Sequence, residues 1–235
     1  MDVKIRELIK QYSNVSESAL DKMALAAEYL KQESKKFNLT SLKTDEDIAM
    51  LHFVDSLTFF ESGVVKGNDS VIDIGCGAGF PSLVIAAADE KLSVTAVDST
   101  AKKAEYVGRC AEYAGINNIK TVSGRAEELA LDRAYRDRFD IATARSVASL
   151  NVLCELCLPF VKKGGHFVAL KGSKGYEEYV DAKKAITSLG AEFVTINETK
   201  IPLADHTHTV IVIRKMSNTP DKYPRPYAKI IKKPL

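Results

Sequence analysis

The segment between Val71 and Gly79 constrains the fold of this chain more than any other. An apolar strand runs into a turn where Gly75, Gly77 and Gly79 alternate with other residues, and a helix-like apolar run follows. Glycine adopts positive φ at little cost and carries no Cβ, so a ligand can approach such a turn closely. A strand, a glycine turn and the start of a helix together predict a site of the nucleotide-binding type.

The spacing of these glycines and two acidic residues indicates which ligand fits. A dinucleotide fingerprint requires a glycine at the position of Phe80, so that class is disfavoured. Asp73 would repel a pyrophosphate and suits an ammonium group, whereas Asp98 ends the next apolar strand, where an acid can bind ribose hydroxyls. S-adenosylmethionine carries both groups and is the predicted cofactor. The alternative is an ordinary turn between a strand and a helix, with glycines there by chance.

Length and composition fit one α/β domain with a small appendage. The 235 residues are 46% hydrophobic and 27% charged, which is close to globular averages. No apolar run reaches the roughly 18–20 residues that span a bilayer, the N-terminus lacks the apolar region of a signal peptide, and the cysteines form no disulfide framework. We expect a cytoplasmic protein without a membrane partner, and we treat the chain as a monomer that holds no metal.

Strands alternate with helices from Ser70 onward, which predicts a mostly parallel, seven-stranded sheet with helices on both faces. The last two strands have no helix between them and predict an antiparallel edge pair. Ligands of such sheets bind at the carboxyl ends of the strands. The expected strands cover residues 70–74, 93–98, 119–123, 139–144, 165–171, 192–198 and 207–214, and the expected helices lie near 80–89, 100–115, 126–132, 146–160 and 176–189.

The two ends of the chain differ from this alternating part. Residues 3–35 have helical periodicity with a break at 14–18, and a further helix places His52, Asp55 and Phe59 on one face. The last 21 residues carry 6 basic and 1 acidic side chains. We expect this basic end to be unstructured. Its positive charge favours contacts with phosphate groups. An equal alternative is that the tail serves only to keep the protein soluble.

Cationic residues follow several strands at the expected active-site edge. Arg125 lies within Gly124–Glu127 after the third strand, where backbone and side-chain groups could hold an adenine edge. Arg145 follows the fourth strand and Lys171 the fifth. A row of cations around a methyl-donor site suits a polyanionic acceptor such as RNA. Taken singly, each of them is more often a solvated surface group.

Sequence motifs that other methyl-transfer reactions require are missing from the sequence. No Asn/Asp-Pro-Pro-aromatic element follows the fourth strand, as methylation of an amino group requires, and no Pro-Cys supplies a nucleophile for a pyrimidine C5. Cys154 and Cys157 have no second pair for zinc, and His206 and His208 alternate along a strand, where they are expected to pack or face water. Guanine N7 holds a free lone pair and needs only alignment, which can contribute roughly 7–11 kcal/mol. This favours N7 without proving it.

Several motifs recur together in one known family. The glycine motif alone is shared by many methyltransferases, whereas its combination with the N-terminal motif and the Tyr-Pro-Arg ending is far more specific. Over nearly its whole length, the chain resembles the small-subunit ribosomal RNA guanine-N7 methyltransferase family, also called glucose-inhibited division protein B. The residues that carry the resemblance are Asn38-Leu39-Thr40, His52, Asp55-Ser56, Asp73-x-Gly75-x-Gly77-x-Gly79-Phe80-Pro81, Gly124-Arg125-Ala126-Glu127, Arg145, Tyr223-Pro224-Arg225 and Pro234-Leu235.

The resemblance implies a bacterial, cytoplasmic enzyme with the class I S-adenosylmethionine-dependent methyltransferase fold, which is Rossmann-like. It implies methyl transfer from S-adenosylmethionine to N7 of the guanine at nucleotide 527 of 16S ribosomal RNA, in the small ribosomal subunit. Loss of this activity is associated with low-level streptomycin resistance. The chain then divides into an N-terminal helical extension, a methyltransferase domain and a basic C-terminal tail, at 1–69, 70–215 and 216–235.

The resemblance also assigns site residues by motif position. Arg145 is expected to be catalytic and to face both the cofactor and the RNA. We assign further contacts with RNA to Arg125, Lys171 and Arg225. The residues expected to bind the cofactor are Asp73, Gly75, Gly77, Gly79, Phe80, Asp98, Ala126, Glu127 and Arg145.

Two positions depart from the family pattern, since Ser82 replaces a common glycine and Ser146 a common alanine. Both residues are small, so we expect cofactor binding to be retained. Two other functions stay open. A methyltransferase for small molecules would not need the cationic edge or the basic tail, and a ribosome-binding protein without catalysis is disfavoured by the intact glycine turn.

Overall fold

The computed structural model describes residues 1–35, 39–203 and 207–235, so Asn38 and His206 lie outside the described residues. Its centre is a seven-stranded sheet in the order β3-β2-β1-β4-β5-β7-β6. The strands β1 to β5 pair in parallel, whereas β7 runs antiparallel between β5 and β6. This confirms the predicted parallel sheet with its antiparallel edge pair. The strands are β1 (Ser70–Ile74), β2 (Ser93–Asp98), β3 (Ile119–Ser123), β4 (Phe139–Arg145), β5 (Val161–Lys171), β6 (Ala191–Lys200) and β7 (Thr207–Lys215).

The strand order reverses beside β1, and this determines where a ligand can bind. The chain passes outward from β1 through β2 to β3 and then returns to place β4 on the other side of β1. The connections that follow β1 and β4 therefore leave in opposite directions and open a crevice at the carboxyl ends of these strands. The glycine turn follows β1 directly and lies at this crevice.

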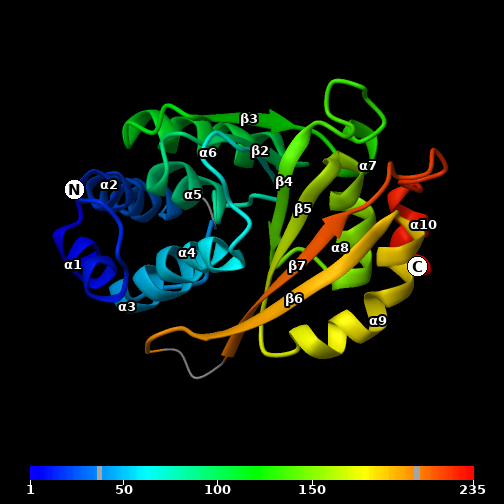
Figure 1. Ribbon diagram of the computed structural model, residues 1–235. Helices are drawn as coiled ribbons and strands as arrows, with labels where there is room; N and C mark the ends of the chain where they lie inside the picture. The colour runs from blue at the N-terminus through cyan, green and yellow to red at the C-terminus, as the bar shows by residue number, and fades with distance from the viewer. Residues whose placement is uncertain (36–38, 204–206) are drawn as a thin grey trace.

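Helices cover both faces of the sheet, as Figure 1 shows. Residues of β1 alternate between two apolar cores, with Val71 in one and Ile72 and Ile74 in the other, because successive side chains of a strand point to opposite faces. The first face carries α5 (Ser82–Ala88) and α6 (Ala101–Tyr113). The second carries α7 (Ala126–Leu129), α8 (Leu150–Cys157), α9 (Gly175–Ser188) and α10 (Tyr227–Lys232).

The N-terminal extension packs into the first core instead of standing apart from it. Its first two helices are α1 (Val3–Tyr12) and α2 (Glu17–Ser34), and the predicted break falls between them. Ser16 ends that break, because its side chain accepts from the Ala19 N–H and caps α2. Leu20 and Leu30 of α2 are buried in the same core as α5 and α6.

The third helical part of the extension is irregular. It consists of α3 (Asp45–Asp47), a π-helical segment Ile48–Val54, α4 (Asp55–Leu57) and a 3₁₀ segment Thr58–Ser62. π-helical turns are rare, and those that do occur often lie at functional sites. No helix in the described ranges is long and apolar enough to cross a membrane.

The C-terminal tail is folded onto the second face, so the expectation of an unstructured end is wrong. Tyr223 and Ile230 are buried in the second core. Arg225 forms a two-pronged ion pair with Glu155 of α8, at 2.8 Å and 2.6 Å, and Glu155 is fully buried. Arg136 donates to two carbonyl oxygens of the tail. The tail is ordered because its apolar side chains pack into the second core and its Arg225 pairs with the buried carboxylate of Glu155.

Replacing Arg225 by Ala should destabilise the fold, because it leaves the buried carboxylate of Glu155 without its cation. Breaking a buried pair on one side costs about 3–5 kcal/mol. Urea unfolding should show this as a lower midpoint. The exposed Arg133 provides the matched control, and Arg133→Ala should stay within about 0.5 kcal/mol of the wild type. Equal midpoints for both variants would contradict the structural role of the pair.

Candidate functional site

Two adjoining cavities lie at the carboxyl ends of β1, β2 and β4. The first measures about 370 Å³ and the second about 270 Å³. Together they fall within the roughly 300–1,000 Å³ typical of small-molecule sites. Gly75, Asp98, Ser99 and Val147 line both cavities. Gly77, Phe80 and Arg145 line the first, and Arg125, Ala126 and Glu127 line the second.

The glycine turn leaves room for a ligand at one of its three glycines. Gly77 has a φ of +57°, and a Cβ added there would meet only the Gly75 carbonyl oxygen, at 3.9 Å. A Cβ on Gly75 would lie 2.6 Å from Val147, and one on Gly79 would lie 2.3 Å from Leu83. Gly77 therefore opens the backbone to the first cavity, whereas Gly79 serves the packing of α5 and lines neither cavity.

Asp98 connects the glycine turn to the second strand. Its Oδ2 accepts from the Gly77 N–H at 3.0 Å, and its Oδ1 accepts from the Thr100 N–H at 2.8 Å. These bonds fix the carboxylate at the boundary of both cavities. Each carboxylate oxygen can accept a second hydrogen bond, so ligand hydroxyls can still bind there. Asp98 therefore keeps acceptor capacity beside both cavities, and its contact with a ribose stays a prediction.

Asp73 lies behind the glycine turn. Its side chain is 1% exposed on the α5 face of β1, and it lines neither cavity. It accepts from the Ser82 N–H at 3.2 Å and so fixes the start of α5 behind the glycine turn. Burial raises the pKa of Asp73 to about 7. Asp73 thus supports the turn from beneath, while its Oδ1 has no hydrogen-bond partner among the described residues, and its contact with the cofactor stays a prediction. Ser82 itself is fully buried, and Ser146, the other departure from the family pattern, has a left-handed φ of +55°.

Arg145, the last residue of β4, is held at the edge of the first cavity by the N-terminal extension. One guanidinium nitrogen donates to the Leu51 carbonyl oxygen at 2.7 Å and to Asp55 Oδ2 at 2.6 Å. The other donates to His52 Nδ1 at 3.2 Å. Only 12% of the Arg145 side chain is exposed. Hydrogen bonds to a charged group are strong, so these contacts fix the direction of the guanidinium.

Asp55 joins Arg145 to the antiparallel edge pair. Its Oδ1 lies 2.5 Å from His208 Nδ1, at the start of β7. Burial by itself would raise the pKa of Asp55, but the hydrogen bond from His208 and the charge of Arg145 lower it below its usual value. The carboxylate is therefore charged at neutral pH and balances Arg145. His208 was expected to pack or face water, and it binds this acid instead.

His52 is a neutral part of the same cluster. Its ring stacks on Phe80, with centroids 4.3 Å apart and planes inclined by 4°. Burial and the charge of Arg145 lower the pKa of His52 to about 3. Because arginine can only donate, Nδ1 is the accepting nitrogen and Nε2–H donates to Thr40 Oγ1 at 2.8 Å. Both ring nitrogens are engaged.

The bond from Arg145 to Leu51 depends on the π-helical turn. The N–H of Asp55 bonds to the Met50 carbonyl, five residues back, and not to the Leu51 carbonyl as in an α-helix. The Leu51 carbonyl thereby loses its α-helical donor and accepts from Arg145. The side-chain periodicity that predicts the helix carries no signal for this change of register.

Two of the three cations assigned to RNA are used inside the protein. Lys171 is 8% exposed, donates to the Ala148 carbonyl oxygen and pairs with Glu178 at 2.8 Å. Arg225 is paired with the buried Glu155. Their assignment to phosphate contacts is therefore corrected, because folding brings each of them an internal partner from a distant part of the chain. Arg125, in contrast, is 52% exposed at the mouth of the second cavity.

Sequence reasoning missed several residues that line the cavities, including Val147, Lys103 and Tyr227. Val147 lies over Gly75 between the two cavities, and Lys103 is exposed at the mouth of the first. Tyr227, from the C-terminal tail, lines the second. Lys103 follows Asp98 by five residues, so its place near a strand end is a signal that could have found it. The position of Tyr227 depends on the folding of the tail and had no local signal.

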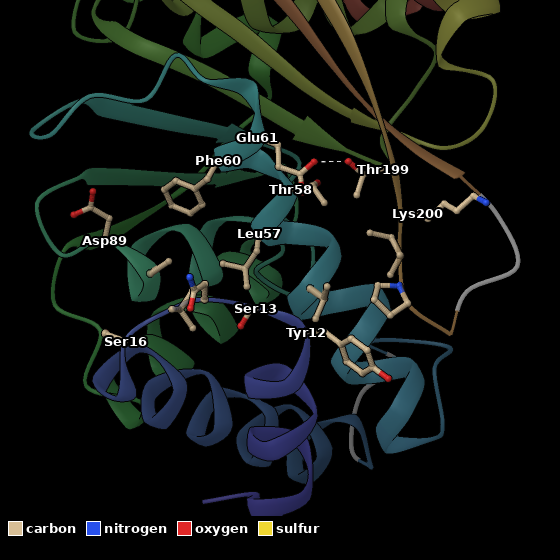
Figure 2. A pocket seen from close by; sticks show the side chains of 16 residues that line it. Tyr12, Ser13, Ser16, Leu57, Thr58, Phe60, Glu61, Asp89, Thr199 and Lys200 are labelled. Carbon is tan, nitrogen blue, oxygen red and sulfur yellow. Dashed lines mark hydrogen bonds between the residues drawn. The ribbon is translucent and has the colours of Figure 1, made fainter.

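A larger cavity of about 650 Å³ lies elsewhere, between the α1–α2 turn and the end of β6 (Figure 2). Its walls include Tyr12, Leu57 and Lys200, and Glu61 accepts a hydrogen bond from Thr199 at its rim. None of the residues predicted to bind cofactor or RNA lines it. Size alone therefore does not identify the functional site here.

Solved structures with a similar fold include known users of S-adenosylmethionine. A crystal structure of TYW2 from M. jannaschii in complex with AdoMet has a TM-score of 0.53 and 16% identity, and the match covers 69% of this chain and 76% of that chain. A methyltransferase structure from Bacillus halodurans has a TM-score of 0.52 and 17% identity over 70% of this chain and all of that one. The [4+2]-cyclase SpnF, with a TM-score of 0.56 and 14% identity, covers 88% of this chain and 99% of its own. These likenesses confirm the predicted methyltransferase fold, and the cyclase shows that the fold alone does not determine the reaction.

Sequence comparison gives a narrower result. A family model described as rRNA small subunit methyltransferase G matches residues 19–208. A protein of Deinococcus deserti named Ribosomal RNA small subunit methyltransferase G is 43% identical over 206 residues, covering 88% of this chain and 84% of that protein. The protein of that name from Acetivibrio thermocellus is 39% identical and covers 100% of this chain and 98% of its own length. The chain therefore belongs to the rRNA small subunit methyltransferase G family.

Proposed function

We propose that this chain transfers the methyl group of S-adenosylmethionine to N7 of the guanine at nucleotide 527 of 16S ribosomal RNA. Family membership supports a methyltransferase that acts on small-subunit ribosomal RNA. The observation that carries the finer proposal is the cluster around Arg145, which holds a cation at the edge of the cofactor cavity and offers no free base. Action on ribosomal RNA also supports the expected cytoplasmic location.

The two cavities suit the two ends of the cofactor. Gly77 exposes open backbone to the first cavity, and Asp98 stands at the boundary of both, where a ribose links the two ends of such a ligand. Ala126 and Glu127 line the second cavity, as expected for an adenine site. When bound, S-adenosylmethionine supplies a methyl carbon that is activated by its positively charged sulfur.

The groups beside the first cavity favour an acceptor that loses no proton. His52 has a pKa of about 3 and both nitrogens engaged, so it does not act as a base at neutral pH. Asp55 is paired with Arg145 and His208. Guanine N7 attacks with its own lone pair, and the product carries the positive charge without releasing a proton. What the protein must supply is alignment, which is the role that a fixed guanidinium can serve.

Arg145 and Asp55 then have distinct parts. Arg145 lines the cavity and can face both cofactor and guanine, so we retain it as the catalytic candidate. Asp55 is absent from the lining of either cavity and acts through Arg145, as a positioning residue. Arg125, exposed at the mouth of the second cavity, stays a candidate for phosphate contacts, and Lys103, exposed at the mouth of the first, takes the place of Lys171 and Arg225.

Unmodified small ribosomal subunits should accept labelled methyl from S-adenosylmethionine when incubated with the protein. Digestion of the RNA should release the label as 7-methylguanosine from a single position. Label in another nucleoside would refute N7 as the acceptor. No label in RNA, together with measurable cofactor binding, would favour a small-molecule acceptor or a protein without catalysis.

Replacing Gly77 by Val should weaken S-adenosylmethionine binding by about tenfold or more, because the side chain enters the open space above the turn. Gly115→Val is a matched control, since Gly115 also has positive φ, at +65°, and open surroundings, but lies in neither cavity. Both variants should lose about 1–2 kcal/mol of stability from backbone strain. Calorimetric titration should find weakened binding only in the Gly77 variant, and unchanged affinity there would refute this placement of the cofactor.

Replacing Asp55 by Ala should lower kcat by about 10²-fold, the scale of effect of a misplaced group near the chemistry. The dissociation constant of S-adenosylmethionine should change little, because Asp55 lines neither cavity. Asp55→Glu should recover part of the rate, and the exposed Asp181→Ala should leave it unchanged. An Asp55→Ala enzyme with the wild-type kcat would show that Arg145 needs no anchor.

A further inference from the structure

We propose that the C-terminal tail completes the cofactor site, with Tyr227 as the wall against which the adenine ring lies. The inference rests on the proposed use of S-adenosylmethionine and adds a residue and a segment to its binding. It gives the tail a task different from the phosphate contacts that its charge suggests.

Tyr227 lies between the second cavity and an outer hollow. It lines that cavity together with Asp98, Ala126 and Glu127. It also lines an outer hollow of about 490 Å³, which contains Pro224 and other tail residues. Arg125 and Glu127 also border both spaces, so these three residues together form the partition between them. Tyr227 is the member that the tail supplies, and without the tail the partition would lose its aromatic ring.

The chemistry of the second cavity suits a flat purine. Ile74, Val97 and Leu156 give it apolar walls, and Tyr227 adds an aromatic ring. Aromatic rings stack on nucleobases without regard to sequence, and each such contact contributes substantially to binding. The guanidinium of Arg125 lies 5.4 Å from the centroid of the Tyr227 ring, close enough for a cation–π contact that steadies the ring.

Residues before and after Tyr227 in the sequence fix its position. Two residues before it, Arg225 is locked to the buried Glu155 by both its backbone N–H and its guanidinium. Three residues after it, Ile230 is fully buried in the second core. A wall that is already positioned costs no ordering entropy when the ligand binds. This explains why a basic tail places Arg225 inward.

A base of the RNA could in principle stack on the same ring from the outer hollow. The geometry favours adenine, because Tyr227 shares its cavity with Asp98, and Asp98 also borders the glycine turn. One ligand that reaches from Gly77 past Asp98 would bring its far end to Tyr227. An RNA base in the outer hollow would have no such continuity with the glycine turn.

Calorimetric titration of the full-length protein can test the inference without any turnover. We expect Tyr227→Ala to raise the dissociation constants of S-adenosylmethionine and of 5′-methylthioadenosine by about tenfold each. The second ligand lacks the amino-acid end, so an equal loss locates the effect at the adenosine end. Tyr227→Phe should stay within twofold of the wild type, and Tyr227→Leu, which keeps apolar bulk in the tail, should fall between.

Tyr176→Ala is the matched control, since Tyr176 is 65% exposed on α9 and lines neither cavity. Thermal unfolding of each variant checks that the tail stays folded. Wild-type affinity for both ligands in Tyr227→Ala would overturn the inference, as would a loss confined to binding of the small subunit, which would assign the ring to RNA. A wild-type protein that binds neither ligand would refute the proposed function itself.

Discussion

The ion pair between Arg145 and Asp55 is the interaction on which the site depends. It joins the end of β4 to the N-terminal extension, and through His208 it reaches the start of β7. Both side chains are nearly buried, so neither charge is solvated well enough to be stable without the other. The extension thus supplies both the anion and the carbonyl oxygen that hold Arg145, so it forms part of the site.

This ion pair also contributes to the protonation state of His52. Burial, together with the charge of Arg145, lowers the pKa of His52 and keeps the imidazole neutral, and a neutral ring can stack closely on Phe80 while donating to Thr40. The stack fixes Phe80 directly after the glycine turn. One buried ion pair therefore fixes both a cation and an aromatic ring at the first cavity, which is the preorganisation that alignment of two reactants requires.

The sheet and the location of the site could be predicted because they depend on local pattern. Apolar runs separated by helical periodicity gave the seven strands, and residues at the ends of adjacent parallel strands must meet. This is why the sequence predicts that Gly77, Asp98 and Arg145 lie close together, and all three line the first cavity. β5 begins at Val161 and not at 165, because Val161 pairs with Phe139 before a register shift that no local pattern reveals.

What could not be predicted depends on partners that are distant in the sequence. Charge patterns do not show that Glu155 of α8 is buried beneath the tail, or that Glu178 meets Lys171, so both cations looked free to bind phosphate. Lys215 is another case, since its ammonium group is fully buried against the Leu158 carbonyl and Thr219. The number of basic residues in the tail therefore overestimates the positive charge that is exposed to bind a polyanion.

The same reasoning changes where RNA should be sought on the surface. A cation already paired in a buried site releases no counterions when RNA binds and adds little to affinity. Two cations at the cavity mouths stay exposed. Lys103 has no ion pair among the described contacts, and Arg125 keeps 52% of its side chain exposed although it pairs with the buried Glu127 at 3.4 Å. We therefore propose that these two residues, and not the tail, make the contacts with RNA phosphates, and that the tail serves the cofactor site.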